Sequence, residues 1–315
     1  MLALRTEGLT KHYSVGFWRK RPYVALDHLT IQVEPGEVFG FLGPNGAGKT
    51  TTLKLLLQLI YPTAGAAWIL GKPAGDLEVK RRIGYLPEHP YFYDYLTAEE
   101  LLTYFASLFG ITGGAGRKRV AAVLDEVGIG AERRRQLRQY SKGMVQRVGI
   151  AQAILNEPEL VIFDEPMSGL DPLGRREMRQ LMLRLRDRGC TVFFSSHILA
   201  DAEALCSRVA ILARGKQVAS GRMTDILAFE LRGWELIVAN VPPERLALVR
   251  QRATHVVELA HGRFSLELPP AAPEPILTFL TDAGATIVSL NPIRDTLEDF
   301  FVRQVAAASS RESEV

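Results

Sequence analysis

Residues 38–60, which decide the fold, read VFGFLGPNGAGKTTTLKLLLQLI. A short apolar run typical of a buried strand comes first, a glycine-rich loop follows, and leucines then recur at helical spacing as far as a stop before Pro62. Residues 43–50 (GPNGAGKT) match the pattern G-x-x-x-x-G-K-[ST] between a strand and a helix. The stretch therefore predicts a strand-loop-helix unit that binds phosphate groups.

The chemistry of this loop suits a nucleotide. Its glycines let backbone N–H groups point inward at the phosphates, and the positive end of the following helix favours their negative charge. Lys49 would reach the β- and γ-phosphates, while the Thr50 hydroxyl would bind Mg²⁺. The alternative is a glycine-rich turn with an incidental lysine. The residues predicted to hold the nucleotide here are Gly43, Pro44, Asn45, Gly46, Ala47, Gly48, Lys49, Thr50 and Thr51.

Two adjacent carboxylates end a second buried strand, LVIFDEP at residues 160–166. The ends of strands are where open α/β sheets meet their ligands. Asp164 would hold Mg²⁺, and Glu165 would act as general base on the attacking water. His197 ends the strand CTVFFSSH in the same layer, where its imidazole would bind the γ-phosphate. A solvated acidic turn and a structural histidine are the competing interpretations.

The alternation of strands and helices continues along residues 1–221. The first part is rich in short strands, with a hairpin signal at Pro35-Gly36-Glu37. Residues 97–157 have a helical apolar period, so a mostly helical insert is expected. Two further buried strands, CTVFFSSH and SRVAILARGK, are joined by a helix. This order predicts an α/β domain with a parallel sheet covered on both faces.

A second domain is expected at residues 222–306. Its segments read as strand, helix, hairpin, helix and strand, followed by the helix TLEDFFVRQV. That order is the βαββαβ of a small α+β ferredoxin-like domain. Residues 307–315, which are small and polar, predict a disordered tail.

Composition limits the function classes without choosing one. No apolar run approaches the ~20 residues that cross a bilayer, and the first residues lack a secretory signal, so a cytoplasmic location is expected. Cys190 and Cys206 fit no metal spacing and are expected to be small buried hydrophobes. The net charge of +3 is compatible with nucleotides or lipid head groups.

These motifs, in this order, resemble the ATP-binding cassette (ABC) family from Leu4 to about Gly221. The family's signature segment stands here as YSKGM, residues 140–144. By resemblance, Ser141 and Gly143 would contact ATP held by a second subunit, so a homodimer or heterodimer is implied. Asp171, in SGLD at residues 168–171, resembles the family's D-loop. Tyr13 resembles the aromatic residue that stacks on adenine, although it could simply pack at a strand end.

The resemblance implies an ABC ATPase fold of the P-loop NTPase class. Its parts would be a RecA-like parallel sheet, an antiparallel β subdomain and a helical subdomain at about residues 89–157. The implied activity is ATP hydrolysis with Mg²⁺, coupled to an integral-membrane permease at the cytoplasmic face of the cell membrane. Neither a transmembrane segment nor a nucleic-acid partner is expected.

Three positions depart from the family pattern. Glu88 stands where glutamine is usual and could still ligate Mg²⁺, but an ionised carboxylate cannot donate a hydrogen bond. Lys142 replaces a glycine and Met144 a glutamine in the signature segment. Lys142 could favour a nearby phosphate or point to solvent. Glu88 together with a C-terminal extension resembles the subgroup that powers ABC-2-type membrane proteins, mostly exporters.

Other readings of the sequence stay open. An ABC ATPase acting on ribosomes or DNA and a P-loop kinase are the two rival functions, and the second domain could be regulatory. The aromatic residues 89–105 would either contact the membrane partner, as the resemblance implies, or pack the helical insert. The mixed aromatic and basic residues 17–23 and the charged residues 132–138, expected on a helix face, are most simply solvated.

Overall fold

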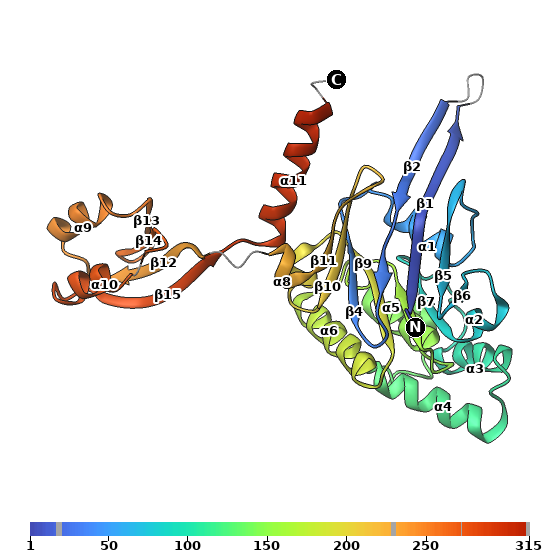
Figure 1. Cartoon of the computed structure of the whole chain (residues 1–315). Coiled ribbons are helices and arrows are strands. Elements are labelled where there is room, and N and C mark those ends of the chain that lie inside the picture. The colour runs from blue at the N-terminus through green and yellow to red at the C-terminus, as the bar shows by residue number, and fades with distance from the viewer. Residues whose placement is uncertain (17–20, 228–230, 272, 313–315) are drawn as a thin grey trace. The chain divides into compact units, whose positions relative to one another are not determined.

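The computed structural model describes residues 1–16, 21–227, 231–271 and 273–312, and it divides into two compact units (Figure 1). The first unit comprises residues 1–223 and 304–315, and the second comprises residues 224–303. The expected boundary after Gly221 lies two residues before this division. Residues 17–20 of the mixed aromatic and basic segment lie outside the described residues.

A five-stranded parallel sheet forms the centre of the first unit. Its strands follow the order β10-β4-β9-β8-β7, so β9 lies between the strands that precede the glycine-rich loop and the two carboxylates. Burial on both faces explains their nearly continuous apolar sequences. The strands are β4 (Val38–Leu42), β7 (Ile83–Leu86), β8 (Leu160–Phe163), β9 (Thr191–Ser196) and β10 (Arg208–Ala213).

Beyond β10 the sheet continues mainly through antiparallel pairs, although β11 and β2 are parallel. The path continues through β11 and β2 to β1, β5 and β6, and β3 pairs with β1. The bounds are β1 (Leu4–Val15), β2 (Arg21–Leu29), β3 (Gln32–Val33), β5 (Ala64–Ile69), β6 (Lys72–Pro73) and β11 (Lys216–Arg222).

The hairpin predicted at Pro35-Gly36-Glu37 is wrong. The turn exists, but β3 before it pairs with β1, whereas β4 after it lies between β10 and β9. All five residues of β4 are buried, and a strand of this kind is most stable in the middle of a covered parallel sheet.

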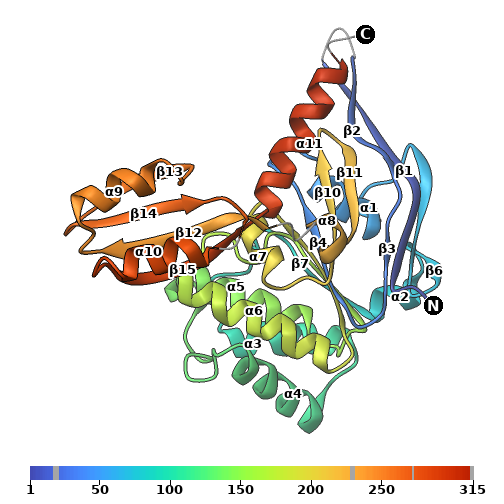
Figure 2. The same ribbon diagram turned by 60° about the vertical axis from the view of Figure 1, so that its left-hand side comes forward.

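Helices cover this framework on both sides (Figures 1 and 2). Helix α1 packs against β2 and β5, while α6 and α7 pack against β4 and β9. The helical insert is present, with α3 and α4 packed together and both against α5. The helices are α1 (Lys49–Leu56), α2 (Leu77–Arg81), α3 (Ala98–Leu108), α4 (Gly113–Glu126), the short 3₁₀ helix η1 (Leu137–Gln139), α5 (Lys142–Ala153), α6 (Pro172–Asp187) and α7 (Leu199–Glu203).

Two local expectations differ from the structure. Helix α1 ends at Leu56 rather than just before Pro62, since Gln58 adopts a left-handed conformation with φ of 52°. Residues 132–138 form turns that lead into η1 rather than a helix face.

The main core lies between the parallel sheet and the antiparallel strands. Leu53 and Leu56 of α1 pack there with Phe39 and Phe41 of β4 and Phe193 of β9. Because α1 is buried in this core, the loop before it is attached to rigid elements at both ends. Cys190 and Cys206 are buried free thiols, as expected, and burial raises the pKa of Cys190 to about 12.

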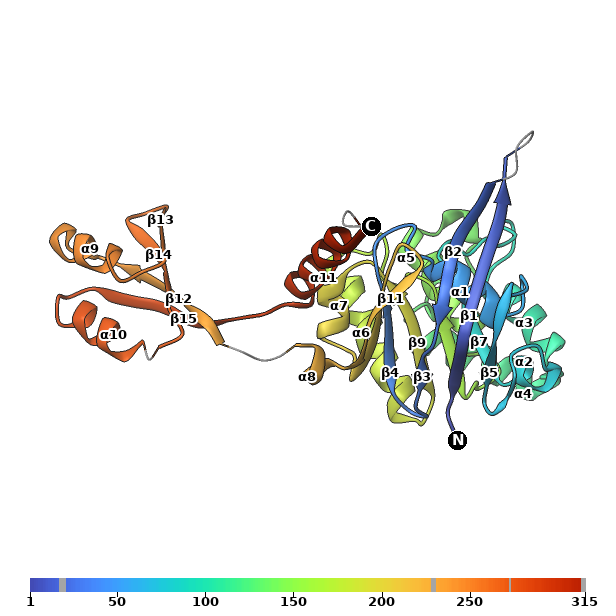
Figure 3. The same cartoon turned by 45° about the horizontal axis from the view of Figure 1, so that its top comes forward.

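The second unit contains the strands and helices in the predicted βαββαβ order (Figures 1 and 3). Its sheet has the order β13-β14-β12-β15 with every pair antiparallel, and α9 and α10 contribute to its separate core. The elements from the end of the first unit onward are α8 (Met223–Ile226), β12 (Leu231–Ala239), α9 (Pro243–Arg250), β13 (His255–Leu259), β14 (Arg263–Leu268), α10 (Glu274–Thr281), β15 (Thr286–Arg294) and α11 (Leu297–Glu312).

Residues 307–312 are helical, whereas their composition suggests a disordered tail, and residues 313–315 of that predicted tail lie outside the described residues. Helix α11 continues to Glu312, and the run of alanines at residues 306–308 favours a helix intrinsically.

The fit of β7 against its neighbours depends on Gly84. A Cβ at this position would lie 1.9 Å from the carbonyl oxygen of Ala153 in α5. We expect Gly84→Ala to lower the free energy of unfolding by about 1–3 kcal/mol, because backbone must move to relieve the contact. Gly114→Ala, in α4 with open space around the new Cβ, should instead leave stability unchanged or raise it. Urea unfolding of both variants measures the difference, and equal stabilities would contradict the packing described.

Candidate nucleotide-binding site

The loop between β4 and α1 needs glycine at two closely packed positions. Gly43 has φ of 155°, and a Cβ there would lie 2.3 Å from the carbonyl oxygen of Leu212 in β10. Gly48 has φ of 106°, and a Cβ there would lie 2.6 Å from the carbonyl oxygen of Ala25 in β2. The loop is thus packed between two strands that are distant in sequence, and any side chain at either position would displace it.

Lys49 begins α1 and is buried beneath the loop. Its Nζ donates hydrogen bonds to the carbonyl oxygens of Gly43 at 2.6 Å and Pro44 at 3.2 Å. The same Nζ lies 3.1 Å from Oε1 of Glu165, and both side chains are at most 7% exposed. This ion pair joins the start of α1, which follows β4, to the residues that follow β8 at the carboxyl end of the parallel sheet.

Ser195 links the Asp164 carboxylate to the backbone of Glu165. Its hydroxyl donates to Oδ1 of Asp164 at 2.6 Å and accepts from the backbone N–H of Glu165 at 2.9 Å. Burial raises the pKa of Asp164 above its ordinary value, although hydrogen bonds with Ser195 and Thr50 oppose the shift. The nearby charges of Glu88 and Glu165 raise this pKa further. Asp164 is therefore a buried carboxylate in a negative environment, which a cation would relieve.

His197 contacts the second oxygen of Glu165. Its ring Nδ1 lies 2.8 Å from Oε2, and its backbone N–H donates to the same oxygen at 3.3 Å. Glu165 itself has φ of 49°, a left-handed conformation that is rare for this residue type. Lys49 on one side and His197 on the other thus hold the Glu165 carboxylate in one orientation.

A cavity of about 320 Å³ opens in front of these groups. Its predicted members are Tyr13, the loop residues 44–51, Glu88 and Glu165, which the structure brings together from β1, the β4–α1 loop and the ends of β7 and β8. Gly43, Asp164 and His197 adjoin it through the contacts above. The volume falls within the range of small-molecule sites.

Three residues of this region are not among the site residues that the sequence predicts. Tyr23 and Ala25 of β2 line the cavity, and Tyr23 lies directly opposite Tyr13 in the β1–β2 pairing. Ser195, which the sequence marks only as part of a strand end, connects the Asp164 carboxylate to the backbone of Glu165. The signal for Tyr23 is the aromatic residue at the start of a strand paired with the Tyr13 strand, but that register is visible only in the fold.

The donor atoms suit Mg²⁺ only in combination with phosphate. Thr50, Asp164 and Glu88 offer hydroxyl and carboxylate oxygens near one another. Among the described residues, no group of three or more His, Cys, Asp or Glu side chains could hold a metal ion alone. Mg²⁺ typically uses one or two carboxylates and takes its other ligands from water and substrate phosphates. The residues fit an ion that arrives with a nucleotide.

Ser141, Gly143 and Asp171 do not line this cavity. Ser141 and Asp171 are exposed and cap helices, accepting from the backbone N–H groups of Met144 at 3.3 Å and Gly174 at 2.8 Å. A Cβ at Gly143 would lie 3.4 Å from the Leu170 side chain, so the start of α5 adjoins residues 168–171. The structure brings these three residues together on another surface of the same unit.

Known proteins share both the sequence and the fold. Residues 26–168 match the family described as ABC transporter. An uncharacterised ABC transporter ATP-binding protein of Synechocystis is 45% identical over 304 residues, which cover 96% of this chain and 84% of the relative. The bacitracin transport ATP-binding protein BcrA of Bacillus licheniformis is 44% identical over 310 residues, covering 97% and 98%.

A solved structure extends the comparison to the reaction. It is a dimeric ATP-binding cassette in a post-hydrolysis state, bound to ADP and Pi, with 26% identity and a TM-score of 0.64 over 70% of this chain and 98% of that chain. The chain therefore belongs to the ABC transporter family, as an ATP-binding protein with the ATPase activity of that family.

Proposed function

We propose that this chain powers an ABC-2-type exporter: two ATPase subunits close on MgATP at the cytoplasmic face of the cell membrane and drive an integral-membrane permease. The observation that carries the proposal is the Glu165 carboxylate, which is held between Lys49 and His197 beside the phosphate-binding loop. A carboxylate fixed in this way can take a proton from a water molecule positioned for attack on a phosphate.

Each residue around the cavity has a definite task in this mechanism. The loop N–H groups and the Lys49 ammonium bind the phosphates, and Tyr13 and Tyr23 offer ring faces for the adenine. Glu165 accepts the proton of the attacking water, and His197 keeps the carboxylate oriented and binds the γ-phosphate. Thr50, Asp164 and Glu88 would hold Mg²⁺, which when bound neutralises charge on the phosphate oxygens.

The need for two subunits is supported by where the signature residues lie. Ser141, Gly143 and Asp171 are outside the cavity of their own chain, and the first and last of these are exposed. They are therefore available to complete the nucleotide site of another subunit. The second subunit would be an identical copy or a paralogue.

A membrane partner is supported by the aromatic residues that follow Glu88. Tyr91, Tyr93 and Tyr95 are 97%, 64% and 60% exposed, so packing within the helical insert does not account for them. Exposed tyrosines are common anchors of protein interfaces. No helix in the described part of the chain is long and apolar enough to span a bilayer. We propose that these tyrosines contact the permease.

The general-base role is tested by Glu165→Gln, which keeps the shape of the side chain and removes the proton acceptor. Turnover should fall by roughly 10²–10⁴-fold, equivalent to about 3–5 kcal/mol of barrier, while ATP binding persists. Phosphate release measures the effect. Glu258→Gln, the same change at an exposed position of β13, serves as the matched control. Parental turnover in Glu165→Gln would refute the assignment.

Removal of the Lys49 ammonium should weaken the binding of ATP and not only slow its hydrolysis. Lys49→Ala is expected to reduce ATP affinity at least tenfold, because the phosphates lose their charged hydrogen-bond donor. Titration with a fluorescent ATP analogue measures the affinity. Lys54→Ala, at an exposed position of the same helix, should bind normally. Equal affinity of the two variants would count against Lys49 as a phosphate ligand.

Coupling to a membrane protein predicts stimulated hydrolysis. ATPase activity of the purified chain should rise several-fold on reconstitution with its ABC-2-type membrane partner, and Glu165→Gln should abolish the rise. Tyr91→Ser should reduce the stimulation without changing the basal rate, since Tyr91 is the most exposed of the three tyrosines and does not line the nucleotide cavity. Activity indifferent to any membrane preparation would favour an ABC ATPase that works without a permease.

A further inference from the structure

The side chain of Lys142 lies along Gly169. Lys142 is the first residue of α5, and a Cβ placed on Gly169 would come within 2.6 Å of its Nζ, 3.0 Å of its Cε and 3.3 Å of its Cδ. Gly169 has φ of 72° and no side chain, so it leaves a flat backbone surface for the lysine stem. The aliphatic part of the Lys142 side chain therefore lies against the backbone of Gly169.

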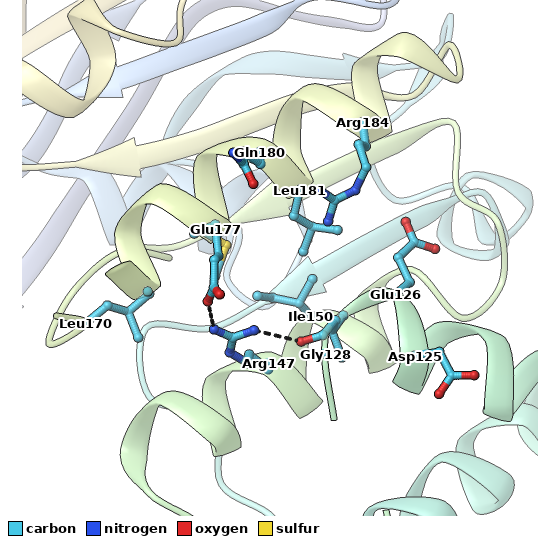
Figure 4. Close-up of a pocket in the computed structure, with 13 residues that line it drawn as sticks. Asp125, Glu126, Gly128, Arg147, Ile150, Leu170, Glu177, Gln180, Leu181 and Arg184 are labelled. Atoms are coloured by element: carbon cyan, nitrogen blue, oxygen red, sulfur yellow. Dashed lines mark hydrogen bonds and ion pairs between the residues drawn. The ribbon is translucent and has the colours of Figure 1, made fainter. Parts of the chain in front are cut away.

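Neighbouring contacts hold the two segments in this arrangement. Gln146 Nε2 donates to the carbonyl oxygen of Pro166 at 3.3 Å, just before residues 168–171. The next residue of α5, Arg147, forms an ion pair with Glu177 of α6, while its Nη1 donates to the carbonyl oxygen of Val127 (Figure 4). Leu170 and this ion pair line a second cavity, which is separate from the nucleotide cavity (Figure 4). The first two turns of α5 are thus attached to residues 166–177.

No acidic side chain in the described part of the chain pairs with the Lys142 ammonium. The first turn of α5 contains no acidic residue, and none of the ion pairs among the described residues includes Lys142. The side chain is exposed and stands at the positive end of the helix, beside Ser141. A cation held in one place at an exposed surface can attract an anion with little further loss of side-chain freedom.

We propose that Lys142 is an electrostatic determinant of ATP-driven subunit association. Gly169 supports its stem, and its ammonium adds positive charge to the surface that Ser141 and Gly143 present to the nucleotide of the other subunit. The inference rests on the proposed function, because the anion belongs to the ATP of a second subunit. It assigns a role to a residue that takes the place of a glycine in the signature segment.

The test compares dimer formation in full-length proteins that bind ATP without turning it over. In the Glu165→Gln background, sedimentation velocity with MgATP gives the dimer dissociation constant. Lys142→Met, which keeps an unbranched side chain and removes the charge, should weaken the dimer about five- to thirtyfold at low ionic strength, since each dimer contains two such lysines. The loss should shrink at high salt. Lys142→Arg should retain most of the affinity.

Two controls separate a specific effect of Lys142 on dimer formation from a change in net charge or in ATP binding. Lys118→Met makes the same charge change at an exposed position of α4 and should leave the dimer constant unchanged. Binding of a fluorescent ATP analogue to the monomer should be equal in all variants, because Lys142 does not line the nucleotide cavity of its own chain.

The outcomes are distinguishable. Equal dimer constants for Lys142→Met and its parent, or equal weakening by Lys118→Met, would overturn the inference and leave the proposed function standing. A Glu165→Gln protein that binds ATP and stays monomeric would overturn the two-subunit mechanism and this inference together.

Discussion

The structure depends on the burial of three charged side chains at one edge of the parallel sheet. Lys49, Asp164 and Glu165 are almost inaccessible to water, and a buried charge without a partner costs several kcal/mol. Their mutual contacts exist only because β9 separates β4 from β8, so that Ser195 and His197 lie between the two ends. The strand order is therefore as much part of the site as the side chains are.

Backbone strain is concentrated at the same place. Glu165 adopts a left-handed conformation, which costs of order 1–3 kcal/mol for a residue with a side chain, and Gly43 and Gly48 fit only without one. Such conformations persist where surrounding packing over-determines them, and here α1 is held in the main core by its leucines. The glycine-rich loop and the carboxylate are thus held in place by packing, and such preorganisation would reduce the entropy that is lost when a nucleotide binds.

The residues proposed to act on ATP lie on two different surfaces of the chain. The nucleotide cavity gathers residues from β1, β2 and the ends of the parallel strands, whereas Ser141, Gly143 and Asp171 lie apart from it on the start of α5 and the segment before α6. Packing, a hydrogen bond and an ion pair join α5 to that segment and to α6, so the proposed mechanism would move them together. This division explains why an ATPase of this family is expected to work in pairs.

The sequence by itself determined the α/β class, the phosphate-binding loop, the acidic strand end and the order of elements in the second unit, because these are encoded by local spacing and apolar periodicity. It did not determine which strands are neighbours. The turn at Pro35 therefore predicts a hairpin that the structure does not contain, and the pairing of Tyr23 with Tyr13 is visible only in the fold. Nor could the sequence place the Lys142 side chain against Gly169. Only the tertiary structure decided these matters, since strand order and the contact with Gly169 arise from packing between residues far apart in the chain.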